Sequence, residues 1–415
     1  MAKIKKIAIS KKLCIFANFI HYSKFDIYFL LEMVKTIKNL FAIGLLSVLG
    51  VGVSFSQEDK DNNMFDSGME QIIVPVQINT SPTDGDTINT LVTAEGEEAN
   101  VMYNIGVTQC NEGNYDDAIV TFSNVLRMNS EMAQAYYGRS SCYMQQKRYD
   151  DAINDLKEYT KRKEDNYATY LIGYCYFHKS DEKSALTYFQ NAIEQGCNKA
   201  DLFYHIGVIN FNEAKYDEAM KYYTRAIEID DTHAFSYNDR GSTYRMLDKI
   251  DKAIEDYNKA VQLNPRMDIF KANLGSAYRI NKNYEKAIEA YDDVLKTNPE
   301  NYIVLNNKGI VQYEMKEYDK AIETLNECLN QKKDYAYAFN NLGLCYYKKK
   351  EYSHAIEAFT KAIGLNPNYG EAYVGRGAAK EMSRDMTGAC SDWEKAESLG
   401  VTNLHEYQTL CNEYK

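Results

Sequence analysis

One unit of the sequence decides the fold. Its first half, residues 237–246, reads YNDRGSTYRM, and its second half, residues 251–261, reads DKAIEDYNKAV. Counting from Tyr237, apolar and small residues fall at i, i+4 and i+7, which places them on one face of a helix. A polar turn, residues 247–249, separates the two halves. The unit therefore predicts two helices joined by a tight turn.

The same unit recurs along the chain from residue 99. A small residue marks each first half, at Gly106, Ser140, Gly173, Gly207, Gly241, Gly275, Gly309, Gly343 and Gly377. An alanine follows twelve positions later, at Ala118, Ala152, Ala185, Ala219, Ala253, Ala287, Ala321, Ala355 and Ala389. Successive alanines are 34 residues apart, except for one spacing of 33. This period indicates an array of nine helical hairpins.

A hairpin of this size cannot bury a core by itself, so its outer face must pack against the next hairpin. A large residue stands 16 positions after each small one and can fill that space, at Phe122, Leu156, Phe189, Tyr223, Tyr257, Tyr291, Leu325, Phe359 and Trp393. Several units end in Asn-Pro, at Pro265, Pro299 and Pro367. Proline stops a helix, so these positions should end the second helix of their units.

The pattern resembles the tetratricopeptide repeat family, in its exported bacterial form. One unit carries the family's full set at the family's spacing: Phe339, Leu342, Gly343, Tyr346, Ala355, Phe359, Ala362 and Pro367. The resemblance covers residues 99–401, with departures at Ser140, Tyr159 and Lys380. It implies an all-α fold, a superhelix (α-solenoid) of nine helix-turn-helix repeats.

A last segment follows the ninth unit, over residues 402–415. Leu404, Tyr407, Leu410 and Cys411 fall on one face of a helix there. We expect this segment to be a cap helix that covers the end of the array.

The cysteines fall into two groups. Cys142, Cys175 and Cys345 all stand two positions after the small residue of their units, which is typical of small core residues. Cys390 and Cys411 lie in the last unit and in the cap segment. They could form a disulfide that pins the cap, or remain two buried thiols.

The resemblance implies a concave groove lined by the first helix of every repeat, with wall residues three and two positions before the small residue. The early repeats place tyrosines there, at Tyr103, Tyr137, Tyr170 and Tyr204. The later repeats place mainly carboxamides, at Asn238, Asp239, Asn273, Asn306, Asn307, Asn340 and Asn341. Arg245 and Arg279, four positions after the small residue, could add charge nearby.

Each group has a physical use. Tyrosine offers rigid apolar area with a polar tip, which suits peptide side chains or sugar rings. Asparagine carries a donor and an acceptor, so a column of asparagines can pair with the amides of an extended peptide. A structural interpretation stands beside both: asparagine is also a harmless solvated residue here, and the tyrosines could pack on a neighbouring helix.

The N-terminal part predicts export. Residues 40–53 read LFAIGLLSVLGVGV and follow a short basic stretch, so residues 33–56 have the parts of a signal peptide with cleavage between Ser56 and Gln57. Fourteen apolar residues are short for a membrane span, although an uncleaved anchor or a buried helix over the same run stays open.

The flanking segments have simpler interpretations. Residues 1–32 place charged residues, among them Lys11, Lys12, Lys24, Asp26 and Glu32, between apolar ones, ahead of a segment that works as a start by itself. We therefore interpret them as an extension before a true start at Met33. Residues 57–98 lack helical periodicity and read as a flexible acidic linker.

Composition and motifs exclude several functions. The formal net charge is −11, and an acidic surface repels a phosphate backbone, so nucleic-acid binding is not expected. The nine cysteines form no CxxC pair, and the six histidines form no HxxxH or HExxH pattern, so no metal site is expected. The sequence lacks a Walker A loop, a GxSxG elbow and a dinucleotide fingerprint. We expect neither a cofactor nor enzymatic activity.

The sequence therefore favours an exported, non-enzymatic scaffold that binds a partner protein or an extended peptide in its groove, in the periplasm or cell envelope. Two alternatives stay open: a glycan-binding module that uses the tyrosines, and a chaperone-like holder of exported chains. Membrane contact is expected only through an uncleaved N-terminal segment.

Overall fold

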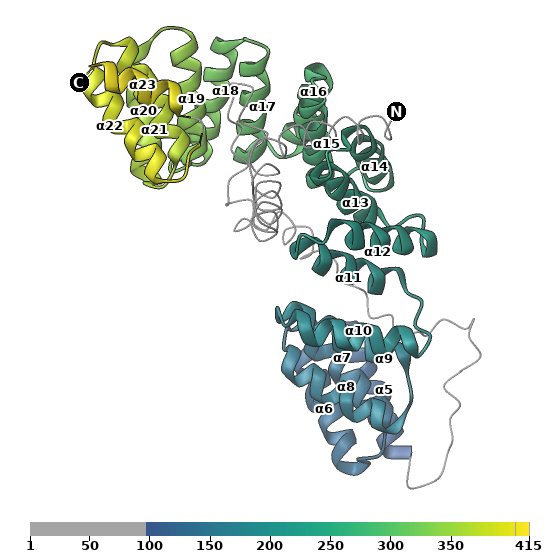
Figure 1. Ribbon diagram of the computed structural model, residues 1–415. Coiled ribbons are helices and arrows are strands. Elements are labelled where there is room, and N and C mark those ends of the chain that lie inside the picture. Colours follow the sequence, from purple (N-terminus) through teal and green to yellow (C-terminus); the bar gives the residue numbers. More distant parts are fainter. Residues whose placement is uncertain (1–96, 403, 415) are drawn as a thin grey trace, which may run out of the picture. The chain divides into compact units, whose positions relative to one another are not determined.

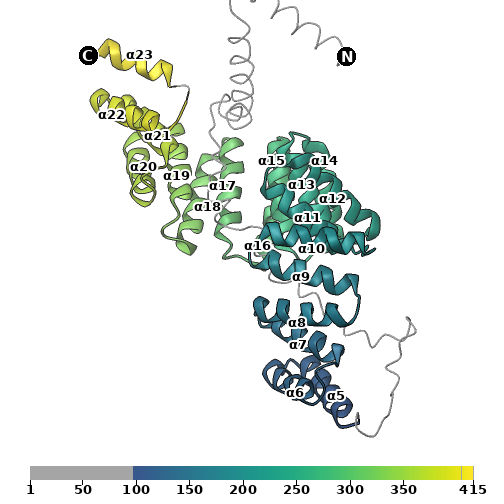
Figure 2. The same cartoon turned by 60° about the horizontal axis from the view of Figure 1, so that its bottom comes forward.

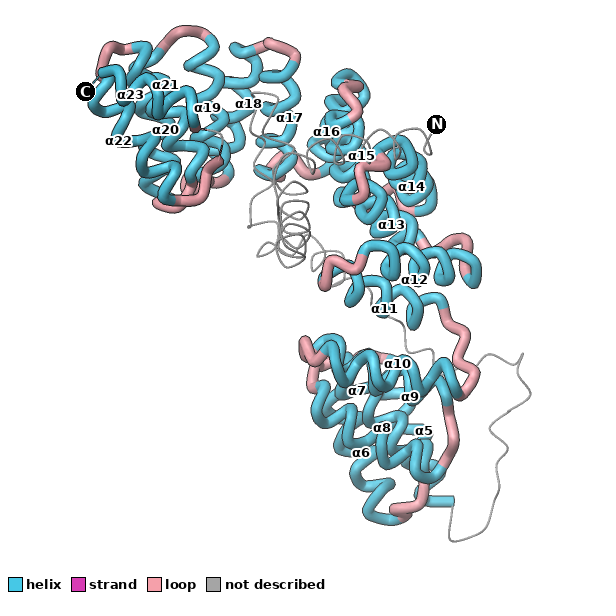
Figure 3. Tube along the Cα trace, viewed as in Figure 1, coloured by secondary structure: helices cyan, strands magenta, loops and turns pink. Residues whose placement is uncertain are grey.

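The computed structural model describes residues 97–402 and 404–414, and all regular structure in them is α-helical (Figures 1 and 3). The first five helix pairs are α5 (Glu97–Asn111) with α6 (Tyr115–Met128), α7 (Ala133–Gln145) with α8 (Tyr149–Arg162), α9 (Asn166–His178) with α10 (Glu182–Glu194), α11 (Ala200–Asn212) with α12 (Tyr216–Ile229), and α13 (Ala234–Met246) with α14 (Ile250–Leu263). The other four are α15 (Asp268–Ile280) with α16 (Tyr284–Thr297), α17 (Tyr302–Glu314) with α18 (Tyr318–Gln331), α19 (Ala336–Lys348) with α20 (Tyr352–Leu365), and α21 (Gly370–Met382) with α22 (Met386–Ser398). The last helix is α23 (His405–Tyr414). The predicted all-α solenoid of nine hairpin repeats is confirmed.

Each pair packs against the next one in chain order (Figure 2). The predictions for residues 1–32 and 33–56, and nearly all of the linker 57–98, lie outside the described residues. Among the helices that the structure describes, none has both the length and the apolar character that a membrane crossing requires.

A buried ring between successive first helices explains the spacing of 16. Phe359 on α20 is 0% exposed. A Cβ on Gly343 of α19, in the same repeat, would lie 2.7 Å from its ring. A Cβ on Gly375 of α21, in the next repeat, would lie 2.4 Å from the same ring. Phe122 has the same relation to Gly106 and Gly138. Glycine is required at these sites because the ring occupies the space of a side chain.

Every turn between the two helices of a repeat uses the left-handed backbone region. In each repeat the residue seven positions after the small one has φ between 56° and 83°: Gly113, Lys147, Ser180, Ala214, Asp248, Lys282, Lys316, Lys350 and Arg384. Only the first of these is glycine, so the other eight carry a side chain in a region that disfavours one.

Three repeats tie their helices together with an ion pair between a partly buried arginine and a buried aspartate. In one, Arg240 Nε and Nη2 donate to the two carboxylate oxygens of Asp256 at 2.7 and 2.9 Å, and Nη1 donates to Thr224 Oγ1 of the preceding repeat at 3.2 Å. The other two ties have the same spacing and join Arg139, Asp155 and Ser123, and Arg376, Asp392 and Thr360. Each arginine thereby joins three helices from two successive repeats.

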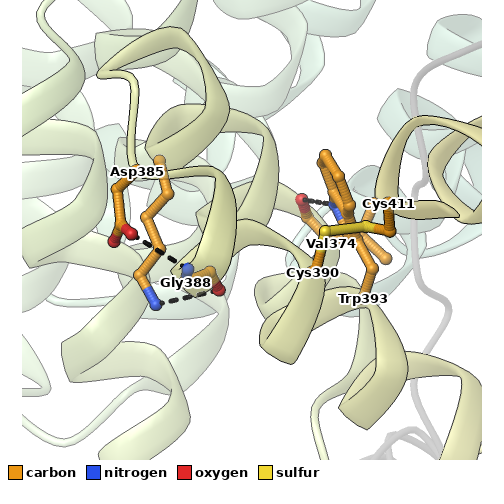
Figure 4. The surroundings of a disulfide bond; sticks show 7 residues. Val374, Asp385, Gly388, Cys390, Trp393 and Cys411 are labelled. Atoms are coloured by element: carbon orange, nitrogen blue, oxygen red, sulfur yellow. Dashed lines mark hydrogen bonds between the residues drawn. A yellow bond between two sulfur atoms is a disulfide. The ribbon is translucent and has the colours of Figure 1, made fainter. Parts of the chain in front are cut away.

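The last helix closes the end of the array. Cys390 of α22 and Cys411 of α23 form a disulfide, next to Trp393 (Figure 4). The Trp393 indole donates to the Val374 carbonyl oxygen at 3.3 Å, and its ring stacks on Tyr407 at 4.3 Å between centroids. In the described residues no tenth repeat follows the ninth, and α23 packs on α22 at that end of the array.

The turn geometry gives a stability prediction for Ala214, an exposed residue at φ 57°. Ala214→Gly should raise the free energy of unfolding by about 0.5–1 kcal/mol, because the left-handed strain of roughly 1–2 kcal/mol exceeds the entropy that glycine adds to the unfolded chain. Thermal unfolding of the full chain measures the change. Gly113→Ala, at φ 83° in the equivalent turn, is the reverse control and should lower the melting temperature. A lower melting temperature for Ala214→Gly would contradict the explanation.

Candidate functional site

The structure divides the predicted wall residues into buried and accessible ones. The buried ones are Tyr170, Tyr204, Asn238, Asp239, Asn273, Arg279, Asn306 and Asn340. The half-buried ones are Tyr103, Tyr137, Arg245, Asn307 and Asn341. Only the second group can contact a ligand without a change in packing.

The tyrosines pack on rings of the second helices. Tyr103 lies 5.8 Å from Phe122 and Tyr137 lies 5.1 Å from Tyr159, measured between ring centroids. Tyr170 is 1% exposed and stacks on Phe189 at 5.9 Å. The burial of Tyr170 and Tyr204 limits the accessible part of this column to its first two members.

In the seventh and eighth repeats, the carboxamides of Asn307 and Asn341 are both hydrogen-bonded to the carboxamide of Asn306. Asn341 Nδ2 on α19 donates to Asn306 Oδ1 on α17 at 2.9 Å. Asn306 Nδ2 in turn lies 3.5 Å from Asn307 Oδ1. Asn306 is buried, whereas Asn307 and Asn341 reach solvent. The buried amide therefore fixes the orientation of two accessible amides on neighbouring repeats.

The same arrangement occurs two repeats earlier, but it is covered. Asn273 Nδ2 donates to Asn238 Oδ1 at 2.9 Å, and Asn238 Nδ2 donates to Asp239 Oδ1 at 2.7 Å. The hydroxyl of Tyr204 donates to Asp239 Oδ2 at 2.9 Å and completes the burial. Ala272 stands where Tyr204 stands, 35 residues before Asn307. A methyl group cannot reach Asn307 as a tyrosine reaches Asp239, so the later set stays open.

The column ends at the eighth repeat. Asn340 occupies the position of Asn238 and Asn306, but the next repeat supplies Gly375 where an asparagine would donate. Asn340 Oδ1 is buried, and no described residue donates a hydrogen bond to it. The predicted arginines differ from each other: Arg279 is buried and donates to Glu314 Oε1 of the next repeat at 2.7 Å, whereas Arg245 is half-buried.

Two titratable groups lie buried beside these residues. Burial raises the pKa of Asp239 to about 6, against the hydrogen bonds from Asn238 and Tyr204. Burial lowers the pKa of His205 to about 4. The backbone oxygen of Asp201 can only accept, so His205 carries its proton on Nδ1 in that hydrogen bond. His205 also lies among Tyr174, Phe177 and Phe189. Neither group is open to a substrate.

Sequence reasoning missed a cleft of about 820 Å³ between α8, α9 and α10, lined in part by Asn154, Lys157, Glu158, Tyr188 and Asn191. Lys157 Nζ donates to the Tyr176 hydroxyl at 3.0 Å, and the Tyr176 and Tyr188 rings stack at 5.4 Å. No periodic signal marks these residues. In the part of the chain that the structure describes, no group of three His, Cys, Asp or Glu side chains could hold a metal ion.

The two buried groups, Asp239 and His205, should have opposite effects on how the free energy of unfolding depends on pH. Unfolded Asp and His have pKa values of about 3.9 and 6.5. The raised pKa of Asp239 makes the unfolding free energy fall as pH rises from about 4 to 6, and the lowered pKa of His205 makes it rise over about the same range. Each effect is on the order of 3 kcal/mol. The two therefore largely cancel in the natural chain.

Single variants should expose each effect in thermal unfolding measured from pH 4 to 7. Relative to the natural chain, Asp239→Asn should gain melting temperature as pH rises, because it removes a buried charge. His205→Gln should lose melting temperature over the same range. Melting curves that shift in parallel for all three chains would show that the two groups do not titrate in this way.

Comparisons with known proteins come from families and from solved structures. Models of the tetratricopeptide repeat match residues 103–165, 148–200, 200–233, 234–267, 278–342 and 336–369. A comparison with curated proteins found no match.

Several solved structures are similar. PilF of Pseudomonas aeruginosa is 21% identical, with 52% of this chain and 97% of that chain covered and a TM-score of 0.45. YrrB, described as a TPR protein with an unusual peptide-binding site, is 21% identical, with 44% of this chain and 95% of that chain covered and a TM-score of 0.38. The Cut9–Hcn1 hetero-tetramer of APC/C is 14% identical, with 79% of this chain and 78% of that chain covered and a TM-score of 0.49. On the matches of the repeat models along its helical array, this chain is a member of the tetratricopeptide repeat family.

Proposed function

We propose that the protein is a non-enzymatic scaffold that binds an extended peptide, or an extended segment of a partner protein, along the first helices of its repeats. Membership of the tetratricopeptide repeat family supports a role in protein–protein interaction. The observation that carries the proposal is a pair of accessible amides, Asn307 and Asn341. Both are hydrogen-bonded to the buried amide of Asn306, which orients them.

The chemistry of this pair suits a peptide backbone. Asn307 uses its oxygen toward Asn306, so its amino group is directed elsewhere and can donate to a peptide carbonyl. Asn341 uses one N–H toward Asn306, so its oxygen can accept from a peptide N–H. Because the array holds both amides in place, a ligand does not have to order them. Contacts of this kind read backbone groups and tolerate different side chains.

The buried state of the titratable groups supports a non-enzymatic role. Asp239 and His205, whose pKa values burial shifts to about 6 and about 4, are 2% and 1% exposed. A general acid or base must come within hydrogen-bond reach of its substrate, which these two cannot do in this packing.

Location in the cell envelope belongs to the proposal as well. It rests on the signal peptide that residues 33–56 predict. The disulfide between Cys390 and Cys411 supports it, because such bonds persist mainly in oxidising compartments. An anchor through residues 40–53 is the alternative form of the same proposal.

The glycan-binding alternative now depends on Tyr103 and Tyr137, since a ring as buried as that of Tyr170 cannot stack on a sugar. Glycan-array binding that is lost on Tyr137→Ala would favour it. No particular contact favours the alternative of a chaperone-like holder, for which preference for denatured clients would be the sign.

The proposal predicts the effect of Asn307→Ala with Asn341→Ala on partner capture. Two lost hydrogen bonds, at about 1 kcal/mol each, should weaken binding by roughly 30-fold. Chemical cross-linking in intact cells followed by mass spectrometry measures capture by the full chain. Thermal unfolding of the variant shows whether the array stays folded.

Asn104→Ala is the matched control, because Asn104 has the same position in the first repeat and is exposed. It should capture the partner as the natural chain does. Unchanged capture by the double variant would reject the amide pair as the site. The same spectra report the N-terminal residue in the cell, expected at Gln57, and a chain that begins before Met33 would refute export by this signal.

A further inference from the structure

Two cysteines of neighbouring repeats lie unusually close together. Cys110 is in the last turn of α5, and Cys142 is in the last turn of α7. Their sulfur atoms are 2.7 Å apart. Both are free thiols, and Cys142 Sγ donates a hydrogen bond to Cys110 Sγ. Non-bonded carbon atoms prefer separations of about 3.5–4.0 Å, whereas a disulfide measures about 2.05 Å. The sulfurs are thus nearer than packing alone requires, and the two side chains already point at each other.

The two positions that meet here recur in every pair of successive repeats, but the residues that occupy them differ. Cys110 stands four positions after its small residue and Cys142 two after the small residue of the next repeat. The same two positions in the seventh and eighth repeats hold Tyr313 and Cys345, and the latter adds to the rise that burial causes in the pKa of Tyr313. In the second and third repeats they hold Met144 and Cys175. Among the described repeats, only the first junction places a cysteine at both positions.

We propose that Cys110 and Cys142 form a disulfide that links the first repeat to the second. This inference goes beyond the scaffold function and does not depend on the partner. It gives the N-terminal end of the array the covalent tie that Cys390 and Cys411 give the C-terminal end.

The first repeat needs such a tie for a physical reason. No repeat precedes it in the part of the chain that the structure describes, and its α5 exposes Val101 and Ile105 at 58% and 47%. An end unit of a linear array has one neighbour instead of two, so it opens more easily than an internal unit. A cross-link to the second repeat opposes that opening.

The bond forms by thiol–disulfide exchange with an oxidant of the disulfide class, such as glutathione disulfide or a protein disulfide oxidant. Cys110 is the more accessible partner, and the hydrogen bond from the Cys142 thiol lowers its pKa. The Cys110 thiolate attacks one sulfur of the oxidant and releases the other as a thiolate. Cys142 then gives its proton to solvent and attacks the Cys110 sulfur, which releases the second thiolate. Two protein thiols lose two electrons and two protons, and the oxidant disulfide gains the electrons.

The test uses the full chain, incubated with glutathione disulfide and then alkylated and digested without reductant. A peptide that joins Cys110 to Cys142 is expected in the natural chain. Oxidation should also slow hydrogen exchange in α5 by roughly tenfold relative to the reduced chain, because a cross-linked end unit opens less often.

Cys142→Ala should abolish both effects, and Cys110→Ala serves the same purpose if the first variant does not fold. Cys345→Ala is the matched control: it removes a fully buried cysteine from the same position of another repeat, where no second cysteine faces it. It should keep the linked peptide and the slower exchange of α5. Complete alkylation of Cys110 in the oxidised natural chain, or its linkage to another cysteine, would overturn the proposal.

Discussion

The ring of Phe359 lies on Gly343 of its own repeat and on Gly375 of the next repeat, and it is fully buried between them. A side chain of the second helix thus fills the space between two first helices. No repeat can satisfy this contact by itself, because half of it is supplied by the following unit. The burial of such rings explains why the chain needs many repeats, and why the end of the array needs a cap with its own ring contact between Trp393 and Tyr407.

The candidate site depends on the same neighbour relation. Hydrogen bonds that join positions 35 residues apart, such as the one from Asn341 to Asn306, exist only because the packed rings bring successive first helices together. The array thereby turns flexible amides into fixed donors and acceptors. It also decides which of them are usable, since Tyr204 covers Asp239 whereas Ala272 leaves Asn307 open. The accessible side chains therefore differ from repeat to repeat, although the packing of the helices is nearly the same in each.

The period of 34 was enough to predict the fold, because a helix forces residues at a fixed spacing onto the same face, and the 16-residue spacing located the buried rings. Burial of single wall residues could not be predicted in this way. Whether Asn307 or Asp239 is accessible depends on a residue of the preceding repeat, and Tyr170 is buried by rings from its own and the next repeat. The left-handed turn at Ala214 could not be predicted either, because no glycine marks it in the sequence. The ion pair between Arg240 and Asp256 could not be distinguished in the sequence from charged residues on the surface.

Hydrogen exchange of the full chain carrying Phe359→Ala tests the shared ring contact most directly. If the ring supports two repeats at once, exchange should become faster in α19 and also in α21, while α13 and α14 keep their natural rates. Faster exchange confined to α19 and α20 would show that each repeat holds its own core. An even increase from α5 to α22 would show a single cooperative unit, and either result would contradict this account.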